Sequence, residues 1–388
     1  MTTPLENSNP AFASPLHVGR PNIADRAKFM QRVDDILDRL WLSNNGPVVQ
    51  EFEAAIATHL GVKHCICVCN ATVGLEIAIR AADLHGEVII PSYTFVATAH
   101  ALQWQEITPV FADMKASTHN IDPSQIERHI TPRTTAIIGT HVWGRPCEID
   151  VLADIASRRG LKLMFDAAHA FGCSYRGRMI GGFGLAEVFS FHATKFLNSF
   201  EGGAITTNDD ELANKIRLMT NFGFAGFDNV VHLGTNGKMS EVSAAMGLTN
   251  LEEIDSLVAT NRANYEAFRE YLSSSKWLSV LEYDLSERCN FQYIVIEVDA
   301  EKSPLSRDEL VAALHADNVL ARKYFWPGCH RMMPYREYYP HAGLLLPVTE
   351  EVAGRIIVLP TGTAIGTSEI QQICNIINQA FASASARA

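Results

Sequence analysis

One lysine stands in a place where lysines are uncommon. The segment Phe189-Ser-Phe-His-Ala-Thr-Lys195 puts Lys195 on a turn directly after an apolar strand, and Glu201-Gly-Gly203 begins the next strand. Lysines usually lie where water solvates the ammonium group. A lysine amine removed from water has a lowered pKa, and its neutral form makes Schiff bases with aldehydes. Taken alone, the pattern also fits a surface lysine at a strand end, so other residues must decide.

Two segments could hold a phosphate group. Asn70-Ala-Thr72 lies between a predicted strand that ends at Cys69 and a predicted helix that starts near Val73. A helix N-terminus with small residues and a hydroxyl is a ready seat for phosphate. Ser190, five positions before Lys195, could make a second phosphate contact. Asn70 alone is better explained as an ordinary helix cap, and Ser190 could be a capping or core hydroxyl.

A carboxylate and an aromatic ring stand at two other strand ends. Asp166 ends the apolar strand 161–166 and is followed by Ala-Ala-His169. Parallel α/β sheets bind ligands at the carboxyl ends of their strands, and a carboxylate there needs a cationic partner. The pyridinium nitrogen of pyridoxal phosphate (PLP), an electron sink, is such a partner, although a neighbouring Lys or Arg would also serve. Phe95 follows the strand 87–91 and could stack on a cofactor ring, although most such aromatic residues belong to the core.

Composition limits the partners and the compartment. The chain has 388 residues, 47% of them hydrophobic and 19% charged, with a net charge of −11 and no basic run. These values favour a globular protein of two packed units and argue against nucleic acid or an anionic membrane as the main partner. No segment has transmembrane length, and Met1–Pro10 lacks the pattern of a secretion signal. The eight cysteines have no zinc spacing, which predicts a reduced, cytoplasmic protein without a metal site.

Strands and helices alternate from about residue 50 to residue 220, which predicts a mostly parallel sheet covered on both faces. A long helical segment at 240–272, with a break near 251–253, would lead to a second unit. The predicted elements of that unit are a strand at 291–298, a helix at 307–314, a strand at 320–325 and a helix at 368–382. We therefore expect an N-terminal arm at 1–20, a large domain at 21–255 and a small α+β domain at 256–388.

These motifs resemble those of the fold-type-I PLP enzymes of the DegT/DnrJ/StrS group, the nucleotide-sugar aminotransferases. The resemblance runs from about Arg20 to Ile376. The motifs that carry it are Gly46-Pro-Val-Val-Gln-Glu-Phe52, Pro91-Ser-Tyr-Thr-Phe-Val-Ala-Thr98, Phe165-Asp-Ala-Ala-His169, Ser190-Phe-His-Ala-Thr-Lys195, Glu201-Gly-Gly203 and Leu359-Pro-Thr361. It implies an α/β fold-type-I transferase, with a mostly parallel seven-stranded sheet in the large PLP-binding domain.

The resemblance also implies a role for each matching residue. Lys195 would hold PLP, Asp166 its ring nitrogen, Phe95 its ring face and His169 its ring hydroxyl, where relatives often have Gln. The segment Asn236-Gly-Lys238 would reach the cofactor phosphate of a partner subunit, which implies a homodimer with shared active sites. Many relatives have Arg in place of Lys238. The predicted cofactor-binding residues are Ala71, Thr72, Phe95, Asp166, His169, Ser190, Lys195, Asn236 and Lys238.

Three further motifs are most similar to those of members that aminate C4 of a dTDP-linked 4-keto-6-deoxyglucose. They are His141-Val-Trp-Gly-Arg-Pro146, Gly234-Thr-Asn-Gly-Lys-Met-Ser-Glu241 and Tyr324-Phe-Trp-Pro-Gly-Cys-His330. The resemblance implies L-glutamate as amino donor and Lys195 as the acid and base. The predicted substrate-binding residues are Arg145, Tyr324 and His330. Arg322, Lys323 and Arg331 are further candidates for the diphosphate, and a plain surface role fits each cation equally well.

Other reactions stay open. A 3-keto sugar could be the acceptor, because the motifs do not fix the carbon that is aminated. The chain could also be a PLP-dependent sugar 3-dehydratase, but dehydratase members of the group have histidine where Lys195 stands. A regulatory protein without turnover is disfavoured by the intact lysine, carboxylate and phosphate turn.

Overall fold

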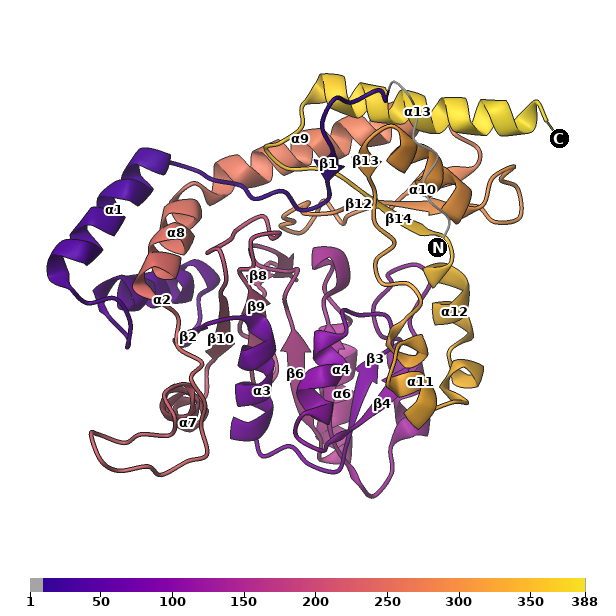
Figure 1. Ribbon diagram of the computed structural model, residues 1–388. Coiled ribbons are helices and arrows are strands. Elements are labelled where there is room, and N and C mark those ends of the chain that lie inside the picture. Colours follow the sequence, from indigo (N-terminus) through magenta and orange to yellow (C-terminus); the bar gives the residue numbers. More distant parts are fainter. Residues whose placement is uncertain (1–9, 388) are drawn as a thin grey trace.

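A seven-stranded sheet forms the centre of the larger part of the molecule (Figure 1). The computed structural model describes residues 10–387. Strand β10 is antiparallel to both of its neighbours, and the other adjacent pairs are parallel, which confirms the predicted mostly parallel sheet. In spatial order the strands are β2 (His64–Val68), β10 (Gly203–Thr207), β9 (Glu187–Ser190), β6 (Lys162–Asp166), β5 (Thr134–Thr140), β3 (Glu87–Pro91) and β4 (Thr108–Ala112).

Helices cover both faces of this sheet. In β3, Ile89 belongs to one buried apolar cluster and its neighbours Val88 and Ile90 to the other, since successive side chains of a strand point to opposite faces. Helices α3 (Ala71–Ala81), α4 (Ala97–Gln103) and α7 (Asp210–Thr220) pack on one face. Helices α2 (Pro47–Leu60), α6 (Ile149–Arg159) and α8 (Glu241–Glu252) pack on the other.

A smaller α+β unit follows at the C-terminal side. Its antiparallel sheet has the order β11 (Leu278–Val280), β12 (Ile294–Val298) and β14 (Ile356–Leu359). Helices α9 (Ile254–Leu272), α10 (Arg307–Ala316) and α13 (Thr367–Ser385) share one apolar core with it. The break between α8 and α9 falls at Glu253, inside the predicted break. The domain boundaries at 20 and 255 stay predictions.

The remaining elements are short or peripheral. Strand β1 (Leu16–His17), in the predicted arm, pairs in parallel with β13 (Val319–Leu320) of the C-terminal unit. Residues 1–9 of that arm lie outside the described residues. The others are α1 (Arg26–Arg39), α5 (Pro123–Ile126), β7 (Ser174–Tyr175), β8 (Arg178–Met179), α11 (Tyr335–Tyr338) and α12 (Pro347–Ala353). Among residues 10–387, no helix is both long and apolar enough to cross a bilayer.

Two predicted strands differ from the observed ones, and one observed helix was not predicted. The strand predicted at 291–298 begins only at Ile294. The predicted strand at 320–325 ends at Leu320, the last residue of β13 that pairs with β1. Arg322 then makes one isolated pairing, with Val358 of β14 in a different sheet. The hydroxyl of Tyr93 then donates to the carbonyl of Tyr324 at 2.6 Å and holds this segment beside the large sheet. Helix α2 has no counterpart among the predicted elements, although it begins with a proline at a first-turn position, which is typical of a helix start.

Replacing Gly247 by alanine is expected to destabilise the protein. A Cβ atom at Gly247 in α8 would lie 2.4 Å from the ring of Phe52 in α2, so the two helices would have to move apart. Such overpacking costs about 1–3 kcal/mol, and a gain of about 1 kcal/mol in helix propensity offsets only part of it; urea unfolding measures the net loss. Gly74→Ala in α3 is the matched control. Its Cβ would come closest to methyl groups of Val68 and Val188, both at 3.1 Å, and improved helix propensity of about 1 kcal/mol offsets this. An equal or larger loss at Gly74 would contradict the prediction.

Candidate active site

The carboxyl ends of β6 and β9 bring the predicted chemistry together. The two strands are parallel neighbours, and Asp166, the last residue of β6, is level with Val188. Strand β9 ends two residues later at Ser190, and Lys195 lies in the loop that follows. Lys195 lies within electrostatic range of Asp166 and lowers the pKa of that carboxyl.

The Asp166 carboxylate is buried, with only 5% of the residue exposed. Burial raises its pKa, because the charged form loses its hydration. Two donors oppose this effect: the hydroxyl of Thr98 at 2.7 Å and the backbone N–H of Ala168 at 3.1 Å. Electrostatic interactions with Lys195 and His141 also lower the pKa of Asp166. The two hydrogen bonds hold the carboxylate in place at the end of β6, where it could accept a hydrogen bond from a protonated ring nitrogen.

The loop that carries Lys195 is fastened by a buried asparagine of the N-terminal segment. The side-chain nitrogen of Asn22 donates to the backbone carbonyl of Phe196 at 2.9 Å. The backbone carbonyl of Asn22 accepts from the side-chain nitrogen of Asn198 at 2.7 Å. The side-chain oxygen of Asn22 also accepts from the backbone N–H of Thr363 at 3.1 Å. One residue therefore joins the lysine loop to a turn of the C-terminal unit.

Lys195 is partly buried, and the loss of hydration lowers its pKa to about 8. Asp166 and Tyr324 act in the opposite direction. The amine donates to the hydroxyl of Tyr293 at 3.2 Å. A lysine with this pKa is partly neutral near physiological pH, and the neutral form is the nucleophile in Schiff-base formation.

His169 lies against the same group of aromatic rings. Its ring is stacked on Phe325, with centroids 5.6 Å apart and an interplanar angle of 7°. Burial, together with the charge of Lys195, lowers its pKa well below the ordinary value, so the ring is neutral. The backbone N–H of Trp143 donates to its Nδ1 at 3.3 Å, which leaves the ring proton on Nε2. His169 can therefore donate one hydrogen bond to a ring hydroxyl.

The turn before α3 has the features of a phosphate seat. The side chain of Asn70 caps the helix by accepting from Val73 N–H at 2.9 Å, so the predicted cap is present. The N–H groups of Ala71 and Thr72 stand in the first turn, where a helix supplies no partner for them. A Cβ atom at Gly203 would lie 2.8 Å from the nitrogen of Ala71, so only glycine leaves this space free.

Phe95 and Ser190 complete the set that fits a phosphorylated aromatic ring. Phe95 precedes α4 and is 57% exposed, so its ring face is free to stack rather than part of the core. Ser190 of β9 is paired with Gly203 of β10, and Gly203 in turn lies against the turn that begins α3. The site thus offers an amine, a carboxylate, a neutral histidine and N–H groups, which are the protein groups that PLP needs.

Tyr324 is the predicted substrate residue that lies nearest to this chemistry. It influences the pKa of Lys195, and burial raises its own pKa. The guanidinium of Arg322 lies over its ring, 4.9 Å from the centroid. The Lys323 amine instead pairs with Asp308 at 3.0 Å, and Arg331 pairs with Glu350.

His330 is buried and already engaged. It is 2% exposed, with Nδ1 2.6 Å from the hydroxyl of Ser92 and Nε2 2.6 Å from a carboxylate oxygen of Glu350. Both ring nitrogens are therefore used inside the protein. This arrangement favours a role in fastening the segment 324–330 to the end of β3 over a direct contact with substrate.

Arg145 is also held by its own surroundings. Its guanidinium donates to the backbone carbonyls of Ser117 at 3.1 Å and Thr118 at 3.4 Å. Burial lowers its pKa, and the groups that oppose this effect are Tyr283, Tyr265, Cys289 and Glu282, residues of the C-terminal unit. These contacts favour a structural role for the side chain.

Asn236 and Lys238 lie at the outer edge of β2. Lys238 pairs with Val68 on the side of that strand that β10 does not occupy, and the carbonyl of Gly237 accepts from Cys69 N–H at 2.7 Å. The Lys238 amine lies over the ring of Phe222, 4.6 Å from its centroid, and burial lowers its pKa.

Three site residues were not predicted. Thr98 is inside a quoted motif, but only the fold shows that its hydroxyl meets Asp166. Tyr293 lies 98 residues from Lys195 and Asn22 lies 174 residues from Phe196, so no local pattern links either pair. An apolar strand interrupted by Gln292-Tyr293 is the one signal that could have drawn attention to Tyr293.

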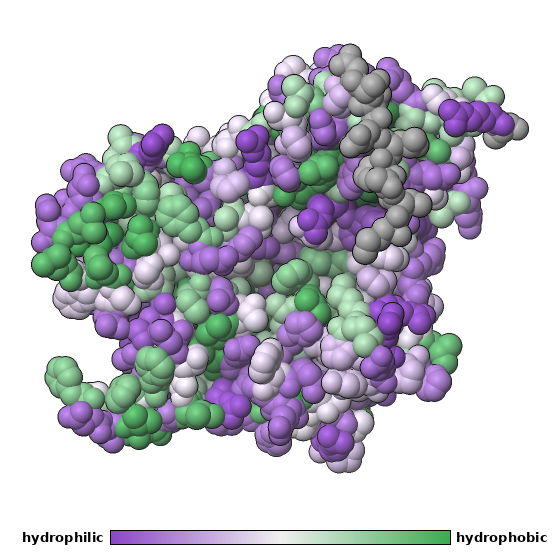
Figure 2. All heavy atoms as spheres, in the orientation of Figure 1, coloured by the Kyte–Doolittle hydropathy of each residue, from purple (hydrophilic) through white to green (hydrophobic). Residues whose placement is uncertain are grey.

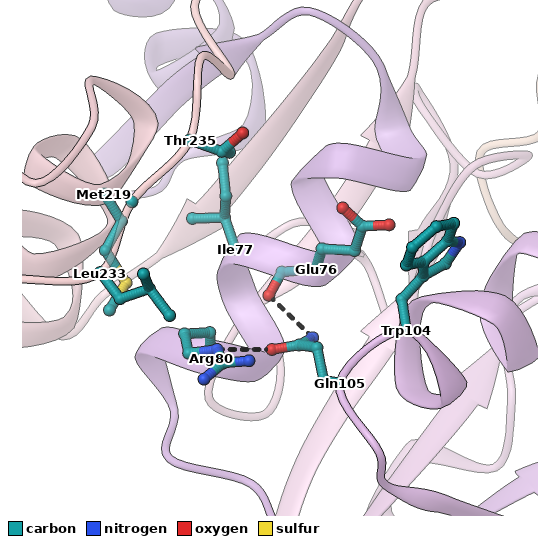
Figure 3. Close-up of a pocket in the computed structure, with 9 residues that line it drawn as sticks. Glu76, Ile77, Arg80, Trp104, Gln105, Met219, Leu233 and Thr235 are labelled. Carbon is teal, nitrogen blue, oxygen red and sulfur yellow. Dashed lines mark hydrogen bonds between the residues drawn. The ribbon is translucent and has the colours of Figure 1, made fainter.

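A groove on the outer side of α3 is distinct from this site (Figure 3). Gln105 accepts from Arg80 at 2.9 Å and donates to the carbonyl of Glu76 at 3.1 Å, as the dashed lines show. The groove is lined by Glu76, Ile77, Arg80, Trp104, Gln105, Met219, Leu233, Gly234 and Thr235. None of the predicted site residues lines it.

The pH dependence of acetylation of Lys195, in the protein freed of cofactor, is expected to have a midpoint near 8. Only the neutral amine reacts, and peptide mapping after trace labelling isolates this lysine. A synthetic peptide of residues 189–201, in which water solvates the amine, should give the ordinary value of about 10.4. Asp166→Asn should lower the midpoint, because the carboxylate raises the pKa of Lys195. A midpoint like that of the peptide, or an upward shift in the variant, would be contrary evidence.

Comparison with known proteins identifies the family of this chain. The chain matches the DegT/DnrJ/EryC1/StrS aminotransferase family over residues 24–378. The dTDP-4-amino-4,6-dideoxy-D-glucose transaminases of Escherichia coli and Shigella dysenteriae are 35% and 38% identical to it, over 93% and 94% of this chain and 97% and 99% of theirs. A solved structure of DesI in the presence of its TDP-sugar product has a TM-score of 0.93 at 48% identity, covering 98% of this chain and 96% of that one. The chain therefore belongs to the DegT/DnrJ/EryC1/StrS aminotransferase family.

Proposed function

We propose that this protein uses PLP to transfer an amino group from L-glutamate to C4 of dTDP-4-keto-6-deoxyglucose. The relatives named dTDP-4-amino-4,6-dideoxy-D-glucose transaminase, and DesI with its TDP-sugar product, support a dTDP-linked amino sugar. The observation that carries the proposal is the Lys195 amine, with a pKa near 8, close to the buried Asp166 carboxylate. Deoxyaminosugar biosynthesis is the setting that this reaction fits.

Each part of PLP has a protein group that would hold it. Lys195 would bind its aldehyde carbon, Asp166 its ring nitrogen and His169 its ring hydroxyl. Phe95 would cover the ring face, and the phosphate would lie at Ser190 and the first turn of α3. When bound, PLP supplies an electron sink that stabilises negative charge on the substrate carbon.

Lys195 would also move the proton. Once the amino donor has replaced it, its neutral Nζ can take the proton from the α-carbon of glutamate and later return it at an adjacent atom. A pKa of about 8 suits this exchange, because acid–base catalysis is most effective when the pKa lies near the working pH. In the second half of the reaction the same amine would deliver a proton to C4 of the sugar. The lysine thus serves both halves.

The sugar nucleotide would enter beside Tyr324. This residue lies within electrostatic reach of Lys195, and the Arg322 guanidinium lies over its ring, which places a cation near a diphosphate. Arg145 and His330 would support the walls of the site through their bonds to Ser117 and Ser92.

We also propose a homodimer in which Asn236 and Lys238 serve the partner's phosphate site. Lys238, Val68, Gly203 and Ser190 are successive pairing partners across the sheet, so three strand spacings, about 14 Å, separate Lys238 from Ser190 of its own chain. The outer side of α1 and the turn after it also carry an apolar patch, visible at the left of Figure 2. Its exposed members are Met30, Leu37, Leu40, Trp41 and Leu42. Patches of this kind mark protein interfaces.

A cytoplasmic location remains part of the proposal. All eight cysteines are unpaired, and seven of them are buried, which agrees with a reducing compartment.

Incubation with dTDP-4-keto-6-deoxyglucose and L-glutamate should give a 4-amino product and 2-oxoglutarate, with the nitrogen located by NMR. Lys195→Ala should abolish turnover, a loss of at least about 1000-fold, while circular dichroism stays unchanged. Borohydride reduction of the holoenzyme should mark Lys195. Nitrogen at C3, loss of the 3-hydroxyl, or labelling of a different lysine would contradict the respective part of the proposal.

Mixing two inactive variants tests the shared sites. Chains with Lys195→Ala and chains with Lys238→Ala, once subunits exchange, should regain about one quarter of the wild-type activity. In each mixed dimer, one site would combine an intact Lys195 with an intact Lys238 from the other chain. The control is a mixture of two Lys195→Ala preparations, which should stay inactive because no site then contains an intact Lys195. If mixed dimers form, as native mass spectrometry would show, but remain inactive, Lys238 does not act across the interface.

A further inference from the structure

The amine of Lys195 has a neighbour that the cofactor does not require. The hydroxyl of Tyr293 lies 3.2 Å from Nζ, and Nζ lies 5.9 Å from the centroid of the tyrosine ring. Among the described residues, this is the one hydrogen bond that the structure gives to the amine. Asp166, in contrast, already accepts from Thr98 and Ala168 and acts on Lys195 through its charge.

The Tyr293 hydroxyl is fixed in position by its surroundings. The residue is 7% exposed and directly precedes β12 of the C-terminal unit. Its ring meets Trp143 edge to face, with centroids 5.2 Å apart, and His169 at 4.8 Å. Its carbonyl accepts from the hydroxyl of Tyr283 at 2.8 Å. A ring held on two sides, with its backbone also bonded, leaves the hydroxyl little freedom.

A tyrosine hydroxyl can serve both charge states of a lysine. Burial raises the pKa of Tyr293, and the charge of Asp166 adds to this effect, so the phenol keeps its proton at neutral pH. A protonated phenol can donate to a neutral amine and can accept from an ammonium. The bond to the ammonium is the stronger of the two, because one partner is charged.

We propose that Tyr293 is a positioning residue for Lys195: its hydroxyl holds the lysine amine, whenever this is free of the cofactor, where it can exchange a proton with the substrate. The inference rests on the proposed function, in which Lys195 moves the proton. Because Tyr293 belongs to the C-terminal unit and Lys195 to the loop after β9, the bond makes the position of the catalytic amine depend on both parts of the chain.

The other groups that face Lys195 do not replace this bond. Asp166 comes from β6, His169 from the turn after β6, and Tyr324 from the segment after β13. His169 is neutral, and its Nδ1 is used by the Trp143 backbone. The charge of Asp166 raises the pKa of Lys195 but does not fix the direction of the amine.

Tyr293→Phe tests the proposal, since it keeps the ring and removes only the hydroxyl. The acetylation midpoint of Lys195 in the cofactor-free full chain should fall by about half a pKa unit to one unit, because a favourable bond to the ammonium is lost. Tyr265→Phe is the matched control. It removes a hydroxyl from the same unit, one that donates to the carbonyl of Leu281, and should leave the midpoint unchanged. An unchanged or raised midpoint in Tyr293→Phe would overturn the proposal.

The holoenzyme gives a second, independent readout. In a single turnover with glutamate, Tyr293→Phe should slow the loss of the α-proton by about 5- to 10-fold, with a larger deuterium isotope effect and a nearly unchanged Kd for glutamate. An equal rate in wild type and variant would count against Tyr293 alone. If the wild-type holoenzyme does not react with glutamate at all, it is the proposed function that fails. The two failures are therefore distinguishable.

Discussion

The site depends on two opposite charges, those of Asp166 and Lys195, which are both shielded from water at the ends of neighbouring strands. Burial raises the pKa of Asp166 and lowers that of Lys195, so each charged form is disfavoured by loss of hydration and favoured by the other residue. Attraction between them alone would bring the two side chains into contact. The hydrogen bonds from Thr98 and Ala168 keep the carboxylate on its own strand, and Tyr293 holds the amine on the other side. A gap is thereby kept between a proton acceptor and a nucleophile.

Both halves of this arrangement need a rigid support, and the support comes from distant parts of the chain. Asn22, buried between the lysine loop and the turn at Thr363, bonds to both. Ser92, His330 and Glu350 form a second chain of hydrogen bonds, buried at Ser92 and His330 and exposed at Glu350, which ties the segment carrying Tyr324 to the end of β3. Such networks are stable only when every polar group has a partner, and in both of them the central side chain does.

Local sequence pattern was sufficient for the sheet and for the residues at its carboxyl edge. Alternating strands and helices predicted the mostly parallel sheet, and the ends of its strands drew attention to Asp166, Ser190 and, on the turn after Ser190, Lys195. Pattern failed where a residue is defined by a distant partner. The sequence made His330 a candidate ligand of the substrate diphosphate, but its Nδ1 is hydrogen-bonded to the hydroxyl of Ser92, 238 residues away. Tyr293 was read as part of an apolar strand, because nothing near it in the sequence indicates that its hydroxyl faces a lysine.

The lysine loop and the proposed dimer surface share one segment. Asn22 bonds to Phe196 and Asn198, both in the lysine loop just after Lys195, and α1, which begins four residues after Asn22, carries the exposed apolar patch. A partner subunit that covers this patch would immobilise α1 and, through the short connection, the asparagine. The same partner would bring its own Lys238 toward the α3 turn. In the proposed assembly, subunit contact would therefore set the position of the catalytic amine as well as complete the phosphate site.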